Sequence, residues 1–220
     1  KGFQVPGGSF EFHGLKAVQG SMIGALVSVS PADKATLGEQ TVKKSGLYLL
    51  TYKNDGRFED IRLLGKSPNG AFSPWPYDFH VDQKGNVILY GLVYKEVILG
   101  GNTVSTLYEG DDFIHAFVAK LDDANDLEFA RVFGGNSFDR PQTLHYEETT
   151  GNLFVYGHFN EDPLSGNPVF QYEEESFTNL GGNDLYVLKL DENGKKLWLN
   201  VLGGSGDDRA AGFTKSGDAI

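Results

Sequence analysis

The sequence contains no cysteine, which excludes a disulfide framework and a zinc site with cysteine ligands. No apolar run approaches the ~18 residues that a membrane-spanning helix needs. The longest run, residues 22–29, is short and contains Gly24 and Ser28. Helical periodicity of useful length is also absent. The chain begins at Lys1 without a signal-peptide pattern, so we expect either a mature form or a fragment.

Positive charge is scarce, with 19 Lys and Arg against 30 Asp and Glu, a net charge of −11. Such a surface repels phosphate backbones and anionic lipid, so we expect neither nucleic-acid binding nor direct membrane insertion. The chain has no phosphate-binding loop, no Gly-x-Ser-x-Gly and no His-Glu-x-x-His. We therefore expect no cofactor.

Glycine and aromatic residues are frequent instead, a profile that suits many short strands joined by tight turns. Residues 185–204 alternate in the manner of two strands that form a β-hairpin. Asn193-Gly194 makes its turn, because a tight hairpin turn needs a positive φ that glycine adopts without a steric penalty.

This hairpin pattern occurs three times, beginning at Leu47, Ala116 and Leu185, with a step of 69 residues each time. A second kind of hairpin, at 78–93 and 143–159, alternates with it. Four strands in each repeat predict an all-β fold, a β-propeller of four-stranded antiparallel blades with about 69 residues per repeat. The alternative is a β-sandwich with coincidental repeats.

The long connections between hairpins hold much of the variation. Residues 97–104 and 35–42 fall at equivalent offsets within them, which predicts a shared local turn.

Residues 116–122, 185–194 and 201–209 resemble the bacterial β-propeller repeat family, often described as seven-bladed. Residues 133–140 match the last of these motifs with substitutions, and the resemblance covers roughly residues 45–220. It implies a propeller fold and a secreted or cell-surface location, associated with the outer membrane in a Gram-negative bacterium.

The repeats divide the chain into four blades. They cover approximately residues 1–64 (partial), 78–133, 142–202 and 209–220 (truncated). A closed ring needs at least ~4 blades and usually more, so we expect a partial ring that is a fragment, or the ordered part, of a longer protein.

Hairpin turns and the connections between hairpins leave a sheet at opposite ends, and long loops on a rigid scaffold are the usual place for recognition. We therefore predict that the long-loop face binds a ligand. Aromatic residues in these loops could stack on sugar rings or anchor a peptide, or could cover a gap between blades. The candidates are Phe72, Trp75, Tyr77, Tyr108 and Tyr172.

His80 and His145 sit at matching places on the predicted inner strands and are candidates for the axial channel. Two histidines with carboxylates could bind a metal, but the fourth repeat has no matching histidine, which favours a packing or channel-lining role and no metal. Asp191 and the other turn acids lack the spacing of a calcium loop, so we expect ordinary turn chemistry there.

Two Asp-Arg pairs follow equivalent Gly-Gly turns, and their repetition argues for a structural role. In each pair we expect the aspartate to accept backbone N–H bonds and the arginine to bridge blades. The pairs are Asp139 with Arg140 and Asp208 with Arg209.

These features favour a secreted or cell-surface module that binds another protein or a glycan, because no catalytic motif is present. One alternative is a glycan-active lyase or hydrolase whose site in the axial funnel uses His80, His145 and nearby acids. The other is a purely architectural subunit of a larger surface complex.

Overall fold

The computed structural model describes residues 8–18, 20, 22–30, 34–37, 40–68, 75–107, 114–135, 139–160 and 169–209. Within these residues the chain forms β-strands and turns without any helix, and every strand pairing is antiparallel. The prediction of an all-β fold is therefore confirmed. In the same part of the chain, no helix offers the length and apolarity needed to cross a membrane.

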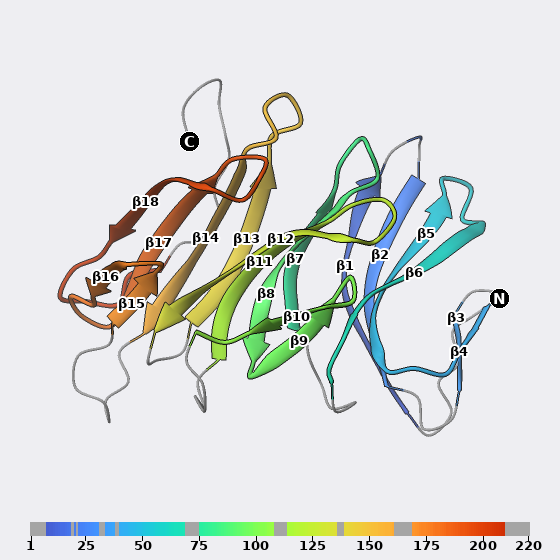
Figure 1. Cartoon of the computed structure of the whole chain (residues 1–220), viewed down its shortest axis with the longest axis horizontal. Helices are drawn as coiled ribbons and strands as arrows, with labels where there is room; N and C mark the ends of the chain where they lie inside the picture. Colours follow the sequence, from blue (N-terminus) through green and yellow to red (C-terminus); the bar gives the residue numbers. More distant parts are fainter. Residues whose placement is uncertain are drawn as a thin grey trace.

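The strands follow one another along the chain as in Figure 1. They are β1 (Ser9–Val18), β2 (Met22–Ser30), β3 (Ala35–Leu37), β4 (Gln40–Val42), β5 (Gly46–Lys53), β6 (Phe58–Lys66), β7 (Trp75–Val81), β8 (Val87–Tyr94), β9 (Glu96–Leu99), β10 (Asn102–Ser105), β11 (Ile114–Leu121), β12 (Leu127–Gly135), β13 (Asp139–Tyr146), β14 (Leu153–Asn160), β15 (Val169–Tyr172), β16 (Glu175–Thr178), β17 (Asn183–Leu190) and β18 (Lys196–Leu202).

Three four-stranded units repeat along the chain. Unit 1 has the strand order β1-β2-β5-β6, unit 2 has β7-β8-β11-β12 and unit 3 has β13-β14-β17-β18. Leu47, Ala116 and Leu185 lie near the start of the third strand of their units, opposite Ser28, Leu92 and His158 respectively. The first strand of each unit also has a register shift at the same point, after Phe12, Pro76 and Pro141. The repeat predicted from the sequence is thus a repeat of structure.

Each unit also carries a short hairpin in the connection between its second and third strands. Hairpins β3–β4 and β9–β10 form at the two segments that were predicted to share a local turn, and β15–β16 is a third. Strand β9 pairs with β6 of unit 1, and β15 pairs with β12 of unit 2. Two of the sheets consequently have six strands, two more than the sequence predicted, whereas unit 3 has four.

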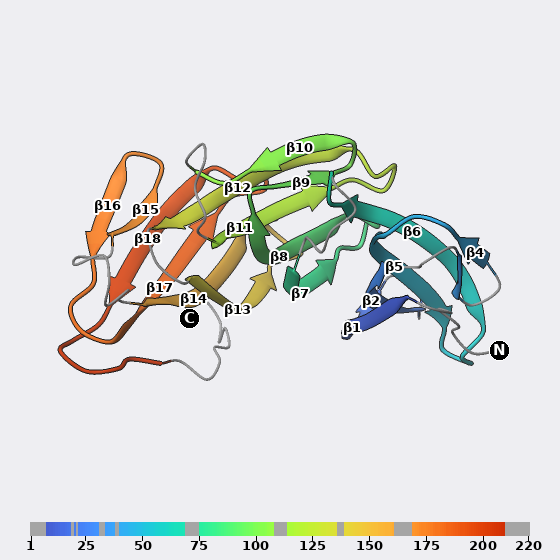
Figure 2. The same ribbon diagram turned by 90° about the horizontal axis from the view of Figure 1, so that it is seen from below.

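The units lie side by side along an arc, with β1, β7 and β13 toward one edge of it (Figure 2). The central strands of unit 2 bury both of their faces. Leu89 and Phe117 point into the core shared with unit 1, whereas Tyr90 and Val118 point into the core shared with unit 3. A third cluster, which includes Val27, covers the other face of unit 1 under β3–β4. Face-to-face burial of apolar residues therefore joins the units.

Two arginines, 69 residues apart, tie each unit to the turns of the next. The Arg62 Nη1 atom donates to the carbonyl oxygens of Gly85 and Asp123, both at 3.2 Å, in two turns of unit 2. At the equivalent place in unit 2, Arg131 Nη2 donates to the carbonyl of Asn193 in unit 3 at 3.5 Å. The turns are thus held against the neighbouring unit by charge-assisted hydrogen bonds.

We predict that Arg62→Ala lowers the free energy of unfolding by about 1–3 kcal/mol, because two carbonyls at the junction of units 1 and 2 lose their donor. Arg57→Ala is the control, since Arg57 is exposed and its side chain pairs with Asp55 in its own turn. It should cost no more than about 0.5 kcal/mol. Urea denaturation measures both values, and equal losses would contradict the bridging role of Arg62.

Candidate functional site

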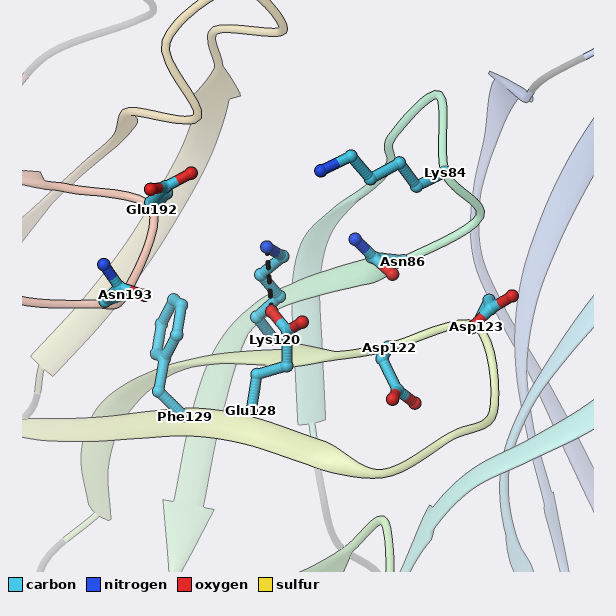
Figure 3. A pocket seen from close by; sticks show the side chains of 9 residues that line it. All are labelled: Lys84, Asn86, Lys120, Asp122, Asp123, Glu128, Phe129, Glu192 and Asn193. Carbon is cyan, nitrogen blue, oxygen red and sulfur yellow. Dashed lines mark ion pairs between the residues drawn. The ribbon is translucent and has the colours of Figure 1, made fainter.

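The tight turns of units 2 and 3 surround a surface hollow of about 700 Å³ (Figure 3). Three turns contribute, those between β7 and β8, between β11 and β12, and between β17 and β18. The lining residues are Lys84, Asn86, Lys120, Asp122, Asp123, Glu128, Phe129, Glu192 and Asn193. This hollow is the candidate functional site in the described part of the chain.

An aspartate at the start of each turn makes these turns rigid. The Asp82 Oδ1 atom accepts the backbone N–H groups of Lys84 and Asn86. Asp191 Oδ1 accepts two N–H groups in the same way, including that of Asn193 at 3.0 Å. These contacts are the ordinary turn chemistry expected for the acids at hairpin turns.

A residue with positive φ completes each turn. Gly194 has a φ of 74°, as the Asn193-Gly194 turn predicted, and Gly85 has a φ of 85°. Asn125 takes this conformation in the turn between β11 and β12, with a φ of 73°. The hollow is therefore bounded by backbone that the sequence fixes locally.

Carboxylates outnumber amines around the hollow. Lys120 Nζ pairs with Glu128 Oε2 at 2.8 Å, and the two opposite charges make this pair neutral overall. The side chain of Lys120 is almost entirely buried. Asp123 and Glu192 are exposed, and Lys84, also exposed, extends its amine toward the side of the hollow where Glu192 lies (Figure 3). The rim consequently has a negative charge that the lining side chains do not cancel.

Tyr146 of unit 3 lies within the electrostatic field of several acids, two of which, Glu128 and Glu192, line the hollow. Burial, together with Asp82, Glu148, Glu128 and Glu192, raises the pKa of Tyr146 to about 12. His80 lies beside it, with ring centroids 5.2 Å apart, and its Nε2 atom lies 2.7 Å from Glu148 Oε1. His80 therefore joins units 2 and 3 next to the hollow.

His145 occupies the same position in unit 3 that His80 occupies in unit 2. His80 pairs with Ile88 and His145 with Phe154, so the two rings point to the same side of successive units rather than toward each other. The ring of His145 lies 6.0 Å from that of Phe154. No group of three or more His, Cys, Asp or Glu side chains that could hold a metal occurs among the described residues.

The aromatic candidates fall in different environments. Tyr77 is 48% exposed at the register shift of β7, and Trp75 is half-buried. Tyr172 is 1% exposed, and its ring lies 5.9 Å from that of Phe133, so it belongs to the core and offers no open ring face. Phe72 and Tyr108 lie outside the described residues.

The two Asp-Arg pairs share one contact. Asp139 Oδ2 accepts the N–H of Gly135 at 3.3 Å, and Asp208 Oδ2 accepts that of Gly204 at 2.7 Å. The ion pair of Arg209 is local, with Asp207 at 2.8 Å.

Contacts between units of the kind expected of these arginines are made by Arg62 and Arg131. The sequence analysis did not single out this second pair. Their 69-residue spacing was the signal that could have revealed them.

A polar centre lies within the core between units 2 and 3. The Tyr90 hydroxyl donates to the carbonyl of Tyr156 at 3.0 Å, which leaves it to accept from the Tyr186 hydroxyl at 2.6 Å. Burial raises the pKa values of Tyr90 and Tyr186 well above their ordinary value, so both remain protonated and able to donate.

His158 is buried on β14, with its Nδ1 atom 3.4 Å from Gln142 Nε2. Burial lowers its pKa below the ordinary value of 6.5, and the positive charges of Arg140 and Arg209 lower it further. At a pH between the pKa of His158 in the folded protein and its pKa in the unfolded chain, only the unfolded chain binds the proton. A fall in pH through this range therefore favours unfolding.

We predict that His158→Gln weakens the dependence of stability on pH. Both proteins should be most stable above about pH 6.5, the unfolded-state pKa of histidine. Below it the wild type should lose free energy of unfolding more steeply than the variant. Denaturation at a series of pH values from about 7 to 5 measures the difference in the free energy of unfolding between the wild type and the variant. The contributions of the other titrating groups are the same in both proteins and cancel in this difference. Parallel curves would contradict the prediction.

Comparison of the chain with protein-family models finds no matching family, and comparison with curated proteins finds no matching relative.

Proposed function

We propose that the three units are blades of a β-propeller of the bacterial repeat type, within a secreted or cell-surface protein. The shared register of the units and the burial of faces between them support this proposal. So does the arc along which β1, β7 and β13 are neighbours (Figure 2). A rigid disc of this kind presents its turns and loops at two opposite ends.

We propose that the chain binds another protein, and that the hollow between units 2 and 3 receives a segment with Lys or Arg side chains. The observation that carries this proposal is the exposed negative rim on rigid turns, formed by Asp123 and Glu192. The net charge of −11 adds a long-range attraction for a basic partner.

A glycan suits this hollow less well than a basic segment does. Sugar rings stack on open aromatic faces, and the aromatic residue here is Phe129. Gly194 lies directly against its ring, because a Cβ atom at Gly194 would stand 2.5 Å from Phe129 Cδ2. The long-loop face, including Tyr77, remains a predicted second surface for a protein or a glycan.

No feature of the hollow specifically supports either alternative function, the glycan-active enzyme or the architectural subunit. An enzyme using His80 and His145 would need both rings at one reacting centre, whereas they point to the same side of successive units. The role of an architectural subunit is compatible with a binding hollow and stays a prediction.

We predict that a lysine-containing peptide binds the chain and that Asp123→Asn with Glu192→Gln weakens this binding about three- to tenfold. Each exposed ion pair contributes about 0.2–1 kcal/mol, so the loss of two pairs spans about two- to thirtyfold, and the middle of that span is expected here. Binding should also weaken as salt is added, because both carboxylates are open to solvent. Isothermal titration calorimetry with hexalysine as the probe measures the change.

A variant with Glu11→Gln and Glu59→Gln is the matched control, because it removes the same charge from two exposed residues of unit 1. It should bind hexalysine nearly as tightly as the wild type. If both double variants lose the same affinity, or if hexaglutamate binds equally well, the hollow is not the site.

A further inference from the structure

A second cavity, of about 150 Å³, lies between units 1 and 2 where their sheets end in tight turns. Four of its lining side chains are apolar, those of Val18, Met22, Leu49 and Val81. Leu49 and Val81 belong to the core that the two units share, whereas Val18 and Met22 are half-buried. An apolar cavity of this volume can hold a group of the size of a benzene ring.

This cavity occupies the junction that corresponds, one unit earlier, to the junction with the hollow. Thr51 of the cavity has the position in unit 1 that Lys120 has in unit 2. Val81 has the position in unit 2 that Tyr146 has in unit 3. Both are much smaller than their counterparts, and this difference leaves room between units 1 and 2.

A single turn separates the cavity from the hollow. Gly85 lines the cavity, whereas its neighbours Lys84 and Asn86 line the hollow (Figure 3). Arg62 is a wall of the cavity, and its Nη1 atom donates to the carbonyl of Asp123, a lining residue of the hollow, at 3.2 Å. An extended segment that lies over the turn between β7 and β8 would therefore reach both.

The charges beside the cavity favour a neutral occupant. Arg62 repels an ammonium group there, and the exposed Asp60 repels a carboxylate. An aliphatic side chain meets neither repulsion and gains free energy as it leaves water against Leu49 and Val81. The small volume suits a side chain such as leucine and is too small for an indole.

We infer that the cavity receives a leucine-sized aliphatic side chain of the same partner segment whose Lys or Arg side chain enters the hollow. The partner then carries an apolar anchor next to a basic one, a usual form of binding hot spot. Alternate Cα atoms of the intervening turn lie no more than about 7 Å apart, and an extended segment advances ~3.3–3.6 Å per residue. We therefore expect roughly two to four residues between the anchors. This inference rests on the proposed binding of a basic segment.

A series of capped peptides tests the inference. Each carries one leucine and hexalysine, joined by serine spacers of increasing length, and a matched series has alanine in place of leucine. We expect the leucine peptide of the best spacing to bind the wild type at least about fivefold more tightly than its alanine counterpart, because the leucine side chain is buried. Isothermal titration calorimetry measures both affinities.

A variant that fills the cavity locates this advantage. Thr51→Met places a longer, uncharged side chain in the cavity wall, and it should remove the advantage of leucine without changing the affinity for the alanine peptide. Thr41→Met is the matched control, because Thr41 is exposed on β4, and it should keep the advantage. Urea denaturation checks that both variants remain folded.

A measurement on the wild type needs no variant. Nuclear Overhauser effects should connect the leucine methyl groups of the bound peptide with methyl groups of Met22 and Val81. Their absence in a complex that shows the advantage of leucine would overturn the inference.

The outcomes also separate this inference from the binding of a basic segment in the hollow. Asp123→Asn with Glu192→Gln should weaken both peptide series and keep the ratio between leucine and alanine. If the peptides bind but leucine gives no advantage at any spacing, or keeps its advantage in Thr51→Met, the cavity is not an anchor site and the hollow remains one. If no peptide binds, both proposals fail.

Discussion

The structure depends on the burial of apolar faces between successive four-stranded units. An antiparallel sheet in a soluble protein commonly leaves one face to water, yet both faces of β8 and β11 are covered. Phe133 shows the density of this contact, because its ring lies within about 6.4 Å of those of Tyr90, Phe170, Tyr172 and Tyr186. A unit without a neighbour would expose this surface, so the units stabilise one another in series.

Polar contacts add specificity to this apolar packing. The hydroxyl pair of Tyr90 and Tyr186 is satisfied only when units 2 and 3 have their correct register. Arg62 fixes turns of unit 2 against unit 1, and Arg131 fixes a turn of unit 3 against unit 2. The candidate site results from the stacking of units 2 and 3, because this stacking brings the three rigid turns that line the hollow together.

Much of the fold could be predicted from the sequence because the signals are local. Alternation located the strands, and the turn at Gly194 followed from its need for positive φ. The pairing of β9 with β6 and of β15 with β12 could not be read in this way, since it joins segments that are far apart and leaves no trace in alternation.

The candidate site was less accessible to sequence analysis. Its carboxylates are spread over three turns, and nothing in their spacing shows that the turns converge. The sequence analysis named Tyr172 as a candidate ligand contact, whereas its side chain is buried in the core. The composition of a strand as short as β15 does not reveal whether its aromatic side chains face solvent or the core. Its place at the end of the first strand of the hairpin, where Leu99 is buried in β9, becomes apparent only once the hairpins are paired.

Hydrogen exchange on Phe133→Ala tests most directly whether the units depend on one another. The side chain belongs to unit 2, and its loss should cost about 3–5 kcal/mol. If stacked faces stabilise the fold, backbone amides in both β11 of unit 2 and β17 of unit 3 will lose protection, whereas β2 of unit 1 keeps more of it. Loss confined to β12 and its immediate neighbours within unit 2 would contradict the account.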